Sequence, residues 1–544
     1  MEVLNSAGKE VFLISDKDRF YRFLNLGSNQ NCLNAFVTES YTDNLKKGEF
    51  DYLYNIIEKN PESFLSVLHV CITNQVCKKQ DPLLFSLAIG ATYKSKSNTS
   101  LSFRKKVYSM IHECCHTPTQ LNIFLDYCKK VSLFKNNSSC WNNTHKKAIL
   151  HWYNRCPSTK IIYQITKYGQ RNGYDHRDVF RLLHPRPKTK AQDIIYHYVI
   201  KTKIKGIDSV NPSANTQNDK EKEEIEEEKE ARQVRDFLEA YEKVKNGSES
   251  VEEVCEMIKQ HNFSREHLPT SFLSETLVWE TLLPHMQPIA LLRNLNKLTS
   301  IGLLDKDEVK DQILEKLRNI KGVHPLQILV CIKIYAQGNG NKGSLCWVPD
   351  QDILRILNEK FLDVHPLEIQ NDKGKILCAL DVSGSMHTYK VFGAECLSAA
   401  ELVIAYAMIL KKQYGEHLDL MCFSERFLPL NVSPHKSLED NLHSIRNIHF
   451  GSTDISVPFL WSLDKKRAYS NFIVMTDNET NMNKIRPSDA LKKYRTEMNI
   501  PDAGLLVIAT SSCNFTVADP NDSRMLDICG FNDVVPKLIQ EFCA

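Results

Sequence analysis

The second half of the chain contains the stretch Ile376-Leu377-Cys378-Ala379-Leu380-Asp381-Val382-Ser383-Gly384-Ser385. Five consecutive apolar residues that end in an aspartate are typical of a parallel strand buried on both faces. After it, the apolar pattern predicts a helix over 395–410, a strand over 418–423, a helix over 438–448, a strand over 472–475, a helix from 487 and a strand over 505–509. Because strands that alternate with helices form doubly wound sheets, residues 373–544 are predicted to be an α/β domain.

Polar side chains follow two of the predicted strands, at the ends where ligands bind in this architecture. A D-x-S-x-S segment comes directly after the first strand, and the glycine inside it permits a tight turn in which alternate residues present oxygens to one point. A carboxylate and two hydroxyls suit a hard divalent cation, and a threonine in the loop 451–454 and an aspartate after the strand 472–475 can supply further ligands. The predicted metal ligands are Asp381, Ser383, Ser385, Thr453 and Asp477.

This order of ligands resembles the metal-ion-dependent adhesion site of von Willebrand factor A (vWA) domains. The resemblance implies a docking site for Mg²⁺, with a coordination position left for water or for a carboxylate of a protein partner, and no catalysis. Haloacid-dehalogenase phosphatases also place an aspartate after a buried strand, but they need a second acid two residues later, where this chain has Ser383. A vestigial site that binds no metal stays open as an alternative, because a sequence does not report occupancy.

The chain before this domain, residues 15–365, has a helical pattern throughout. Apolar residues recur at spacings of three and four, and proline pairs such as Asn60-Pro61 and Thr117-Pro118 divide the segment into roughly fifteen short helices. Many short helices without a strand pattern predict stacked antiparallel pairs, as in an α-solenoid. Residues 206–232 interrupt the pattern; eight acids against three lysines between 219 and 230 predict a solvated, flexible insert without chemistry of its own. Alternatively, this segment is the frayed start of the helix that contains Phe237, Tyr241 and Val244.

Composition narrows the class of protein further. The chain has 544 residues, which is too long for one hydrophobic core and indicates several domains. Its 17 cysteines are scattered and often lie in apolar runs, as expected of reduced thiols in a reducing compartment. We expect no membrane span, because no long uninterrupted apolar stretch occurs, and no secretory signal at the N-terminus.

Residues 146–205 are strongly basic, with 14 Lys and Arg against three acids. Aromatic residues interleave with these cations, and cations for phosphates together with rings for bases are the components of single-strand nucleic-acid binding. Lys167, Gln170 and Arg171 stand at i, i+3 and i+4 and would share a helical face. Two alternatives stay open: a solvated basic face without a partner, and aromatic rings that belong to the core of helical pairs.

One further motif, His112-Glu113-Cys114-Cys115-His116, matches the H-E-x-x-H pattern of zinc proteases. Its context argues against a protease, because Pro118 would end the helix almost at once and the extended motif has glycine where this chain has Thr119. No glutamate lies between Glu113 and Glu221 to serve as the third ligand. We therefore predict no zinc site here and no enzyme.

The run Thr166-Lys167-Tyr168-Gly169-Gln170-Arg171-Asn172-Gly173-Tyr174-Asp175-His176-Arg177-Asp178 resembles the corresponding segment of the TROVE module. The triplet Arg22-Phe23-Leu24 and the run Ala290-Leu291-Leu292-Arg293-Asn294-Leu295 add to this likeness. Together with the vWA domain they make the whole chain similar to the Ro autoantigen family. One departure is Gly169, where the family pattern has a basic residue.

The resemblance implies a ring of helical HEAT-like repeats closed by the vWA domain. It implies a monomeric scaffold in the cytoplasm and nucleus that binds small non-coding Y RNAs on an outer basic face. It also implies that the single-stranded 3′ ends of misfolded RNAs enter a central hole, for RNA quality control. The RNA-binding candidates are Lys147, Lys167, Gln170, Arg171 and His184. The alternative function is a metal-dependent protein-docking scaffold that acts through the vWA domain.

Overall fold

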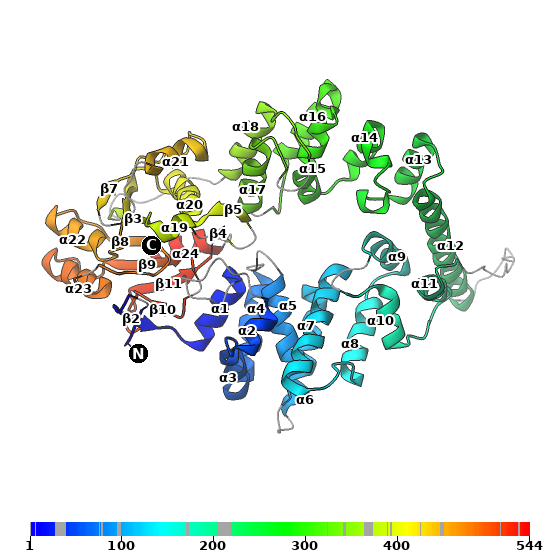
Figure 1. Cartoon of the computed structure of the whole chain (residues 1–544), viewed down its shortest axis with the longest axis horizontal. Coiled ribbons are helices and arrows are strands. Elements are labelled where there is room, and N and C mark those ends of the chain that lie inside the picture. The colour runs from blue at the N-terminus through cyan, green and yellow to red at the C-terminus, as the bar shows by residue number, and fades with distance from the viewer. Residues whose placement is uncertain are drawn as a thin grey trace. The chain divides into compact units, whose positions relative to one another are not determined.

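The computed structural model describes residues 2–5, 7–27, 40–74, 77, 80–94, 99–169, 173–204, 219–323, 325–340, 344–363, 374–388, 390–391, 394–424, 426–446, 451–482, 484–511, 513–530 and 534–543. It divides into two compact units. We call Met1–Pro82 with Leu314–Ala544 the α/β unit, and Leu83–Ile313 the helical unit. Figure 1 labels their helices and strands along the chain.

A six-stranded sheet is the centre of the α/β unit. Its strands lie in the order β11 (Met525–Cys529), β9 (Gly504–Ala509), β8 (Asn471–Thr476), β3 (Ile376–Asp381), β6 (Leu418–Phe423) and β7 (Phe427–Pro429). Neighbouring strands are parallel except β7, which pairs antiparallel with β6 at the edge. The predicted doubly wound α/β domain is therefore confirmed, and the edge strands β7 and β11 are additions to the prediction.

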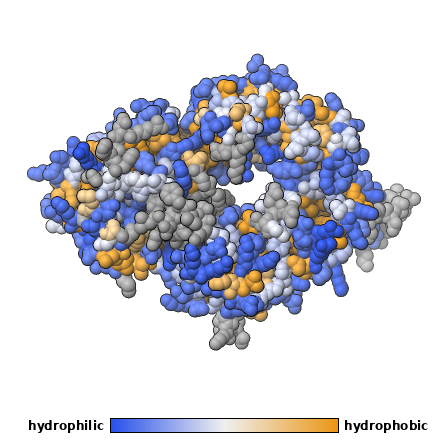
Figure 2. Space-filling view, viewed as in Figure 1, coloured by the Kyte–Doolittle hydropathy of each residue, from blue (hydrophilic) through white to orange (hydrophobic). Residues whose placement is uncertain are grey.

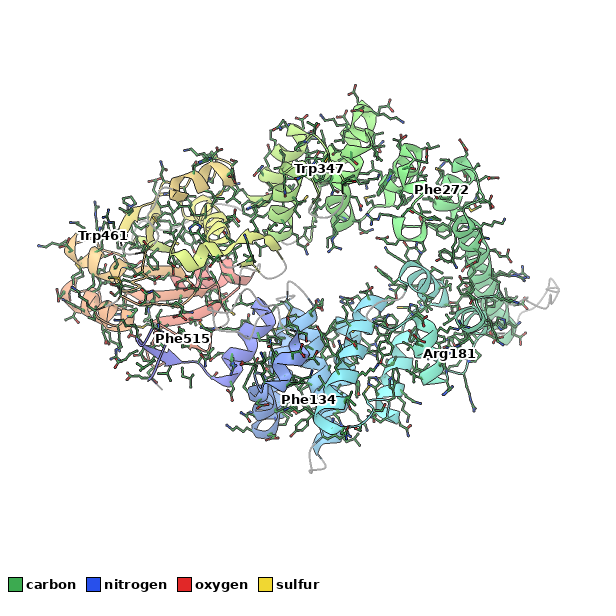
Figure 3. The ribbon with its side chains drawn as sticks, in the orientation of Figure 1. Phe134, Arg181, Phe272, Trp347, Trp461 and Phe515 are labelled. Atoms are coloured by element: carbon green, nitrogen blue, oxygen red, sulfur yellow. The ribbon has the colours of Figure 1, made fainter. Side chains whose placement is uncertain are left out.

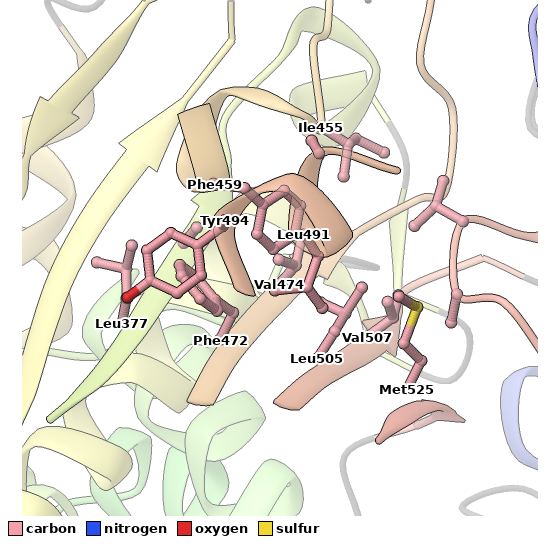
Figure 4. Close-up of a cluster of buried hydrophobic side chains, with 14 of the residues drawn as sticks. Leu377, Ile455, Phe459, Phe472, Val474, Leu491, Tyr494, Leu505, Val507 and Met525 are labelled. Carbon is pink, nitrogen blue, oxygen red and sulfur yellow. The ribbon is translucent and has the colours of Figure 1, made fainter. Parts of the chain in front are cut away.

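Helices cover this sheet because its strands are apolar on both faces. In the core shown in Figure 4, Leu377, Val474 and Leu505 of the strands pack under α22 (Val457–Asp464) and α23 (Pro487–Glu497). The Tyr494 hydroxyl is buried there and donates to the backbone carbonyl of Arg467 at 3.0 Å. The other helices of the sheet domain are α19 (Gly384–Thr388), α20 (Ala399–Tyr414), α21 (Leu438–Arg446) and α24 (Val534–Cys543).

The structure corrects the helix that we predicted over 395–410. Ala394–Ser398 form strand β5, which pairs with β4 (Lys390–Val391), and the helix α20 begins only at Ala399. Ser398 decides this start, because its hydroxyl accepts the Glu401 N–H and the Glu401 carboxylate accepts the Ser398 N–H. This reciprocal capping box terminates the strand and begins the helix.

The N-terminus contributes strands that the sequence analysis did not predict. Strands β1 (Glu2–Leu4) and β2 (Glu10–Leu13) form a hairpin, and β2 pairs with β10 (Phe515–Thr516). Helix α1 (Asp16–Leu26), capped by Ser15, also packs on this part of the α/β unit. The remaining helices of the unit are α2 (Tyr41–Lys46), α3 (Asp51–Lys59), α4 (Pro61–Thr73), α17 (Pro325–Ala336) and α18 (Gln351–Phe361).

The helical unit is a succession of packed helices, and its described residues contain no strand. The helices are α6 (Thr99–Cys114), α7 (Pro118–Asn136), α8 (Asn143–Tyr153), α9 (Ser158–Lys167), α10 (His176–Leu183), α11 (Lys190–Lys201), α12 (Asp219–Asn246), α13 (Val251–His261), α14 (Thr276–Leu282) and α15 (Pro288–Ser300). Helices α5 (Asp81–Thr92) and α16 (Asp307–Arg318) lie at its borders. The predicted array of short helices is confirmed, whereas closure of the array into a ring stays a prediction.

In its second part, the acidic insert 206–232 agrees with the alternative prediction, that it is the start of the following helix. Residues 205–218 lie outside the described residues, but from Asp219 the insert is the beginning of α12, a helix of 28 residues. Among the helices that the structure describes, none is both long and apolar enough to cross a membrane.

Candidate functional site

Two buried aspartates mark the carboxyl end of the central sheet. Asp381 ends β3 and Asp477 directly follows β8, and these two strands are parallel neighbours. The chain passes from β3 to β6 on one side and later returns to β8 on the other, so the two acids lie at the point where the winding of the sheet reverses. This is the usual place for a ligand site in doubly wound folds.

The hydroxyls of the D-x-S-x-S turn lie against both acids. Asp381 accepts the Ser383 N–H at 2.9 Å, and the Ser383 and Ser385 hydroxyl oxygens are 3.2 Å apart. The Ser385 side chain lies close enough to Asp477 to lower the pKa of that carboxyl. One turn therefore connects the two strand ends, as the alternation of oxygen-bearing residues predicted.

Burial raises the pKa of both Asp381 and Asp477, because neither carboxylate can be solvated as a charge. The negative charge of Asp477 raises the pKa of Asp381 further. Hydrogen bonds from Ser383 and from the Thr476 hydroxyl, which donates to Asp381 at 2.7 Å, oppose this effect. Two carboxylates that repel each other in a buried site gain most from a bound cation.

Thr453 joins the same group through its backbone. Its N–H donates to the Asn481 side-chain oxygen at 2.7 Å, and its carbonyl accepts the N–H groups of Asn481 and Met482. The loop that contains Thr453 is thereby attached to the segment that follows Asp477. The sequence analysis missed two residues that position this site: Thr476, which holds Asp381, and Asn481, which holds Thr453. Only the position of Thr476 directly before Asp477 could have indicated its role.

The donors of this site fit a hard cation. The predicted ligand set consists of two carboxylates and three hydroxyls, and all of its oxygens belong to the carboxyl ends of β3 and β8 or to the loops beside them. Elsewhere in the described residues, no three His, Cys, Asp or Glu side chains lie close enough together to hold a metal ion. Oxygen ligands of this kind suit Mg²⁺ better than a softer transition metal.

The structure describes three of the five RNA-binding candidates. Lys147 is exposed on α8, and His184 is exposed in the left-handed conformation that ends α10. Lys167, at the end of α9, is only 22% exposed, and its ammonium lies 3.6 Å from the Glu266 carboxylate. Gln170 and Arg171 lie outside the described residues. Because Glu266 partly neutralises Lys167, this lysine is a weaker phosphate ligand by itself than the sequence suggested.

Most of the aromatic rings in the basic segment are core residues. Trp152, Tyr153, Tyr174, Tyr196 and Tyr198 are buried, so for these five the alternative that the rings belong to the core of helical pairs is confirmed. Four of them lie on α8 and α11, and Tyr174 lies just before α10, so these rings fill the space where the helices pack. Only Tyr163 and Tyr168 are half-buried.

One cation of the basic segment, Arg155, also has a structural role. The Arg155 guanidinium lies over the Trp152 ring and donates to the carbonyls of Cys115 at 2.8 Å and His116 at 3.0 Å, just beyond the end of α6. Arginine in this position satisfies carbonyls that a helix end leaves without partners.

Exposed cations nevertheless remain along the helices of the basic segment. Arg181 on α10 is exposed and labelled in Figure 3, and hydrophilic residues dominate the face of α8 and α10 drawn in Figure 2. The exposed cations are Lys147, Lys160, Arg177, Arg181, Arg186, Lys188, Lys190, Lys201 and Lys203. They belong to consecutive helices and the loops between them, so they can present charge to a polyanion.

The acidic half of α12, to which the sequence analysis assigned no chemistry, stabilises this segment. The Glu230 carboxylate accepts the Ser158 N–H at 2.6 Å, and Glu227 accepts the Lys190 N–H at the same distance. Glu228 pairs with the Lys190 ammonium at 3.0 Å. Acids at the N-termini of α9 and α11 complement unpaired N–H groups and the helix dipole.

The two histidines of the H-E-x-x-H motif do not lie on one helical face. Helix α6 ends at Cys114, so His116 lies beyond the helix and cannot share a face with His112. The His112 ring packs edge-on against His151, with 4.4 Å between the ring centroids. Thr117 then caps α7.

Comparison with known proteins places this architecture in a family. The TROVE domain model matches residues 3–344, and the Ro60 vWA domain model matches residues 375–543. The chain belongs to the Ro60 family. The resemblance drawn from the TROVE-like segment and the order of metal ligands is thereby confirmed.

Ro60 relatives match along nearly the whole chain. The RNA-binding protein RO60 of Caenorhabditis elegans is 32% identical over 593 aligned residues, which cover 99% of this chain and 90% of that protein. The RNA-binding protein RO60 of Deinococcus radiodurans is 25% identical and covers 99% and 95%. The crystal structure of the Deinococcus radiodurans Ro (RSR) protein superposes with a TM-score of 0.67 at 24% identity, over 97% of this chain and 99% of that one, which supports the same fold.

Proposed function

We propose that this Ro60 family member is an RNA-binding ribonucleoprotein component without catalytic activity. Its ligands are small non-coding Y RNAs, bound on the basic face of α8 to α11, and misfolded non-coding RNAs with single-stranded 3′ ends, in RNA quality control. The observation that carries the proposal is the set of exposed cations on consecutive helices, such as Arg181, Arg186 and Lys188. The names of the RO60 relatives as RNA-binding proteins support it.

RNA binding to this face is expected to depend steeply on salt, because each phosphate contact releases a counterion. Replacing Arg181, Arg186 and Lys188 together by alanine is expected to raise Kd about tenfold to a hundredfold and to make the plot of log K against log salt shallower by about 2–3. Fluorescence anisotropy with a hairpin RNA that carries a 3′ single-stranded tail measures both quantities.

The matched control removes Lys243, Lys245 and Lys259, which are exposed on α12 and α13. This variant loses the same charge and is expected to change Kd less than threefold, roughly the long-range effect of net charge alone. Equal losses in the two variants, or wild-type binding that ignores salt, would contradict the proposed face.

The second candidate function is metal-dependent protein docking through the vWA domain. Asp381, Ser383, Ser385, Thr453 and Asp477 would hold Mg²⁺. When bound, Mg²⁺ would offer a coordination position to a carboxylate of a partner. The chain supplies the two repelling carboxylates that favour a cation and the hydroxyls that orient them. Met482, 53% exposed in the loop attached to Thr453, gives the rim of the site an apolar contact for such a partner.

Millimolar Mg²⁺ or Mn²⁺ is expected to raise the melting temperature of the wild type by several degrees, because a cation that binds only the folded state stabilises it. Asp381→Ala is expected to abolish this shift while RNA affinity stays within about twofold, since the two sites use different residues. Differential scanning fluorimetry with and without EDTA measures the shift. Glu416→Gln, at the exposed amino end of β6, is the control and should respond like the wild type. Equal responses of Asp381→Ala and the wild type would support the vestigial alternative.

We include a location in the cytoplasm and nucleus and a monomeric state in this proposal. The buried free thiols of Cys378 and Cys422 support a reducing compartment.

A further inference from the structure

The N-terminal segment, which consists of β1, β2 and α1, contacts the loops of the candidate metal site at two separate points. Asn5, in the turn between β1 and β2, donates from its side-chain amide to the Thr480 carbonyl at 2.8 Å. Arg22 on α1 donates to the Cys513 carbonyl at 2.6 Å, and the same guanidinium nitrogen lies 3.5 Å from the Cys513 sulfur. All four residues are buried. Because 475 and 491 positions separate the two pairs, the sequence could not indicate these contacts.

Each contact reaches a residue that itself lies against a predicted metal ligand. Thr480 follows Asp477 in the same loop, and its hydroxyl donates to the Thr453 carbonyl at 3.3 Å. The Cys513 thiol lies 3.6 Å from the Asp477 carbonyl, to which the Ser511 hydroxyl donates at 2.7 Å. A single residue therefore connects the N-terminal segment to each of the two ligands that lie outside the D-x-S-x-S turn.

The Asn5 side chain has two roles that can be separated. Its oxygen accepts the N–H groups of Ala7 at 3.1 Å and Lys9 at 2.8 Å, which closes the turn of the hairpin. Its amide nitrogen donates to Thr480 in the metal-site loop. An aspartate at this position would keep the first role and lose the second, because a carboxylate accepts hydrogen bonds and donates none.

The N-terminal segment also packs on the helices that follow it. The Phe20 ring of α1 stacks on the Phe64 ring of α4, with 4.9 Å between the ring centroids, and both rings are buried. Closely packed cores do not deform continuously, so a displacement of α1 would also disturb α4.

We propose that the N-terminal segment is a structural part of the metal site, in which Asn5 and Arg22 position the two loops that carry the distal ligands. A loop that is held in place before the cation binds loses less conformational entropy on binding. Cation binding and docking of the N-terminal segment are then linked, and each strengthens the other by the same factor. This inference rests on the proposed metal-dependent function of the vWA domain and adds an element that the site needs for its affinity.

The test measures Mn²⁺ binding to the full chain by isothermal titration calorimetry. Asn5→Asp is expected to raise the Kd of Mn²⁺ about fivefold, which corresponds to the loss of one hydrogen bond that fixes the loop. Asn5→Ala introduces no charge and removes the turn contacts as well, so it is expected to raise Kd by about fivefold or more. Agreement between the two variants excludes a direct effect of the new carboxylate on the cation.

The reciprocal effect is measured by hydrogen exchange of the β2 amides, with and without saturating Mn²⁺. In the wild type, Mn²⁺ is expected to slow this exchange about fivefold, the same factor by which Asn5 strengthens cation binding. Asp381→Ala should abolish the slowing, because it removes a ligand of the cation. A residue that merely stabilised the hairpin would not make the protection of β2 depend on Mn²⁺.

Glu10→Gln is the matched control on the same hairpin. Glu10 is 60% exposed and pairs with Arg486 at 3.7 Å. This variant should keep the Kd of Mn²⁺ within about twofold of the wild type and keep the slowing of exchange, because an exposed ion pair contributes little.

The outcomes separate this inference from the proposed metal site. Wild-type Mn²⁺ binding that persists unchanged in Asn5→Asp and Asn5→Ala would overturn this inference alone. Weaker binding in both variants without slower exchange of β2 in the wild type would break the required reciprocity and would overturn it too. A wild type that binds no Mn²⁺ would overturn the inference together with the metal site.

Discussion

Replacing Arg22 by alanine is expected to lower the free energy of unfolding of the α/β unit by about 3–5 kcal/mol, the usual cost of breaking a buried ion pair from one side. Arg22 lies on α1 and is only 3% exposed. Its guanidinium donates to the Asp527 carboxylate at 2.6 Å and to the carbonyls of Cys513 at 2.6 Å and Phe515 at 2.9 Å. Phe515, labelled in Figure 3, belongs to β10.

The effect is large because several buried groups lose their partner together. Alanine leaves the Asp527 charge, which is 12% exposed, without its cation, and it leaves two carbonyls without a donor. Urea unfolding monitored by hydrogen exchange of β9 and β11 measures the loss in this unit. Arg22→Lys keeps the charge but not the fork of donors, so we expect an intermediate loss.

Arg19→Ala is the matched control on the same helix. Arg19 pairs with Glu49 at 3.7 Å near the surface, and exposed pairs contribute about 1 kcal/mol or less. The double variant Arg22→Met with Asp527→Leu should recover part of the stability, since an apolar pair removes the buried charges. Equal losses for Arg19→Ala and Arg22→Ala would show that Arg22 does not hold α1 to the sheet.

The helical unit is expected to lose about 6 kcal/mol of stability between pH 7.5 and pH 5, about 2 kcal/mol for each of three buried histidines. Burial lowers the pKa of His145 to about 3 and the pKa of His176 and His267 to about 4. Tyrosine hydroxyls lie within hydrogen-bond distance of two of these rings, Tyr108 at 3.0 Å from His145 and Tyr153 at 2.9 Å from His176. A loss of this size approaches the whole stability of a typical domain.

The sign follows from proton binding. Unfolded histidines take up protons below their ordinary pKa of about 6.5, whereas the folded ones stay neutral until pH 3–4. Acid therefore favours the unfolded state in this window, and the stabilisation is complete only above pH 6.5. Hydrogen exchange of α8 and α10, corrected for the intrinsic dependence of exchange on pH, measures the loss.

His145→Gln is expected to reduce the acid-induced loss by about a third, because one of the three titrating groups is gone. His184→Gln, which removes an exposed histidine at the end of α10, is the control and should leave the pH profile unchanged. Protection that is the same at pH 5 and pH 7.5 in the wild type would contradict the assignment.

The strands, and the oxygen-bearing residues at their carboxyl ends, could be predicted because their signals are local. A strand buried on both faces needs consecutive apolar residues. The turn after β3 needs oxygens at alternate positions with a glycine between them. The segment from Ile376 to Ser385 contains both patterns. Thr453 and Asp477 became candidate ligands through their order after recognisable strands. The start of α20 is also determined locally, by the capping box of Ser398 and Glu401. The apolar residues before it have a pattern that also suits a helix, so the helix was predicted to begin too early.

Tertiary structure decided which of the charged and aromatic residues are available to a ligand. By itself the sequence determined the two-part fold, the order of the oxygen-bearing residues at the strand ends and a basic segment of high charge. It could not determine that Trp152 and Tyr198 are core residues, that Glu228 and Glu266 partly neutralise Lys190 and Lys167, or that β2 pairs with a strand about 500 residues away. The physical reason is that periodicity and capping act between neighbours in the chain. Burial, ion pairing and strand pairing depend instead on which apolar faces meet once the chain has folded.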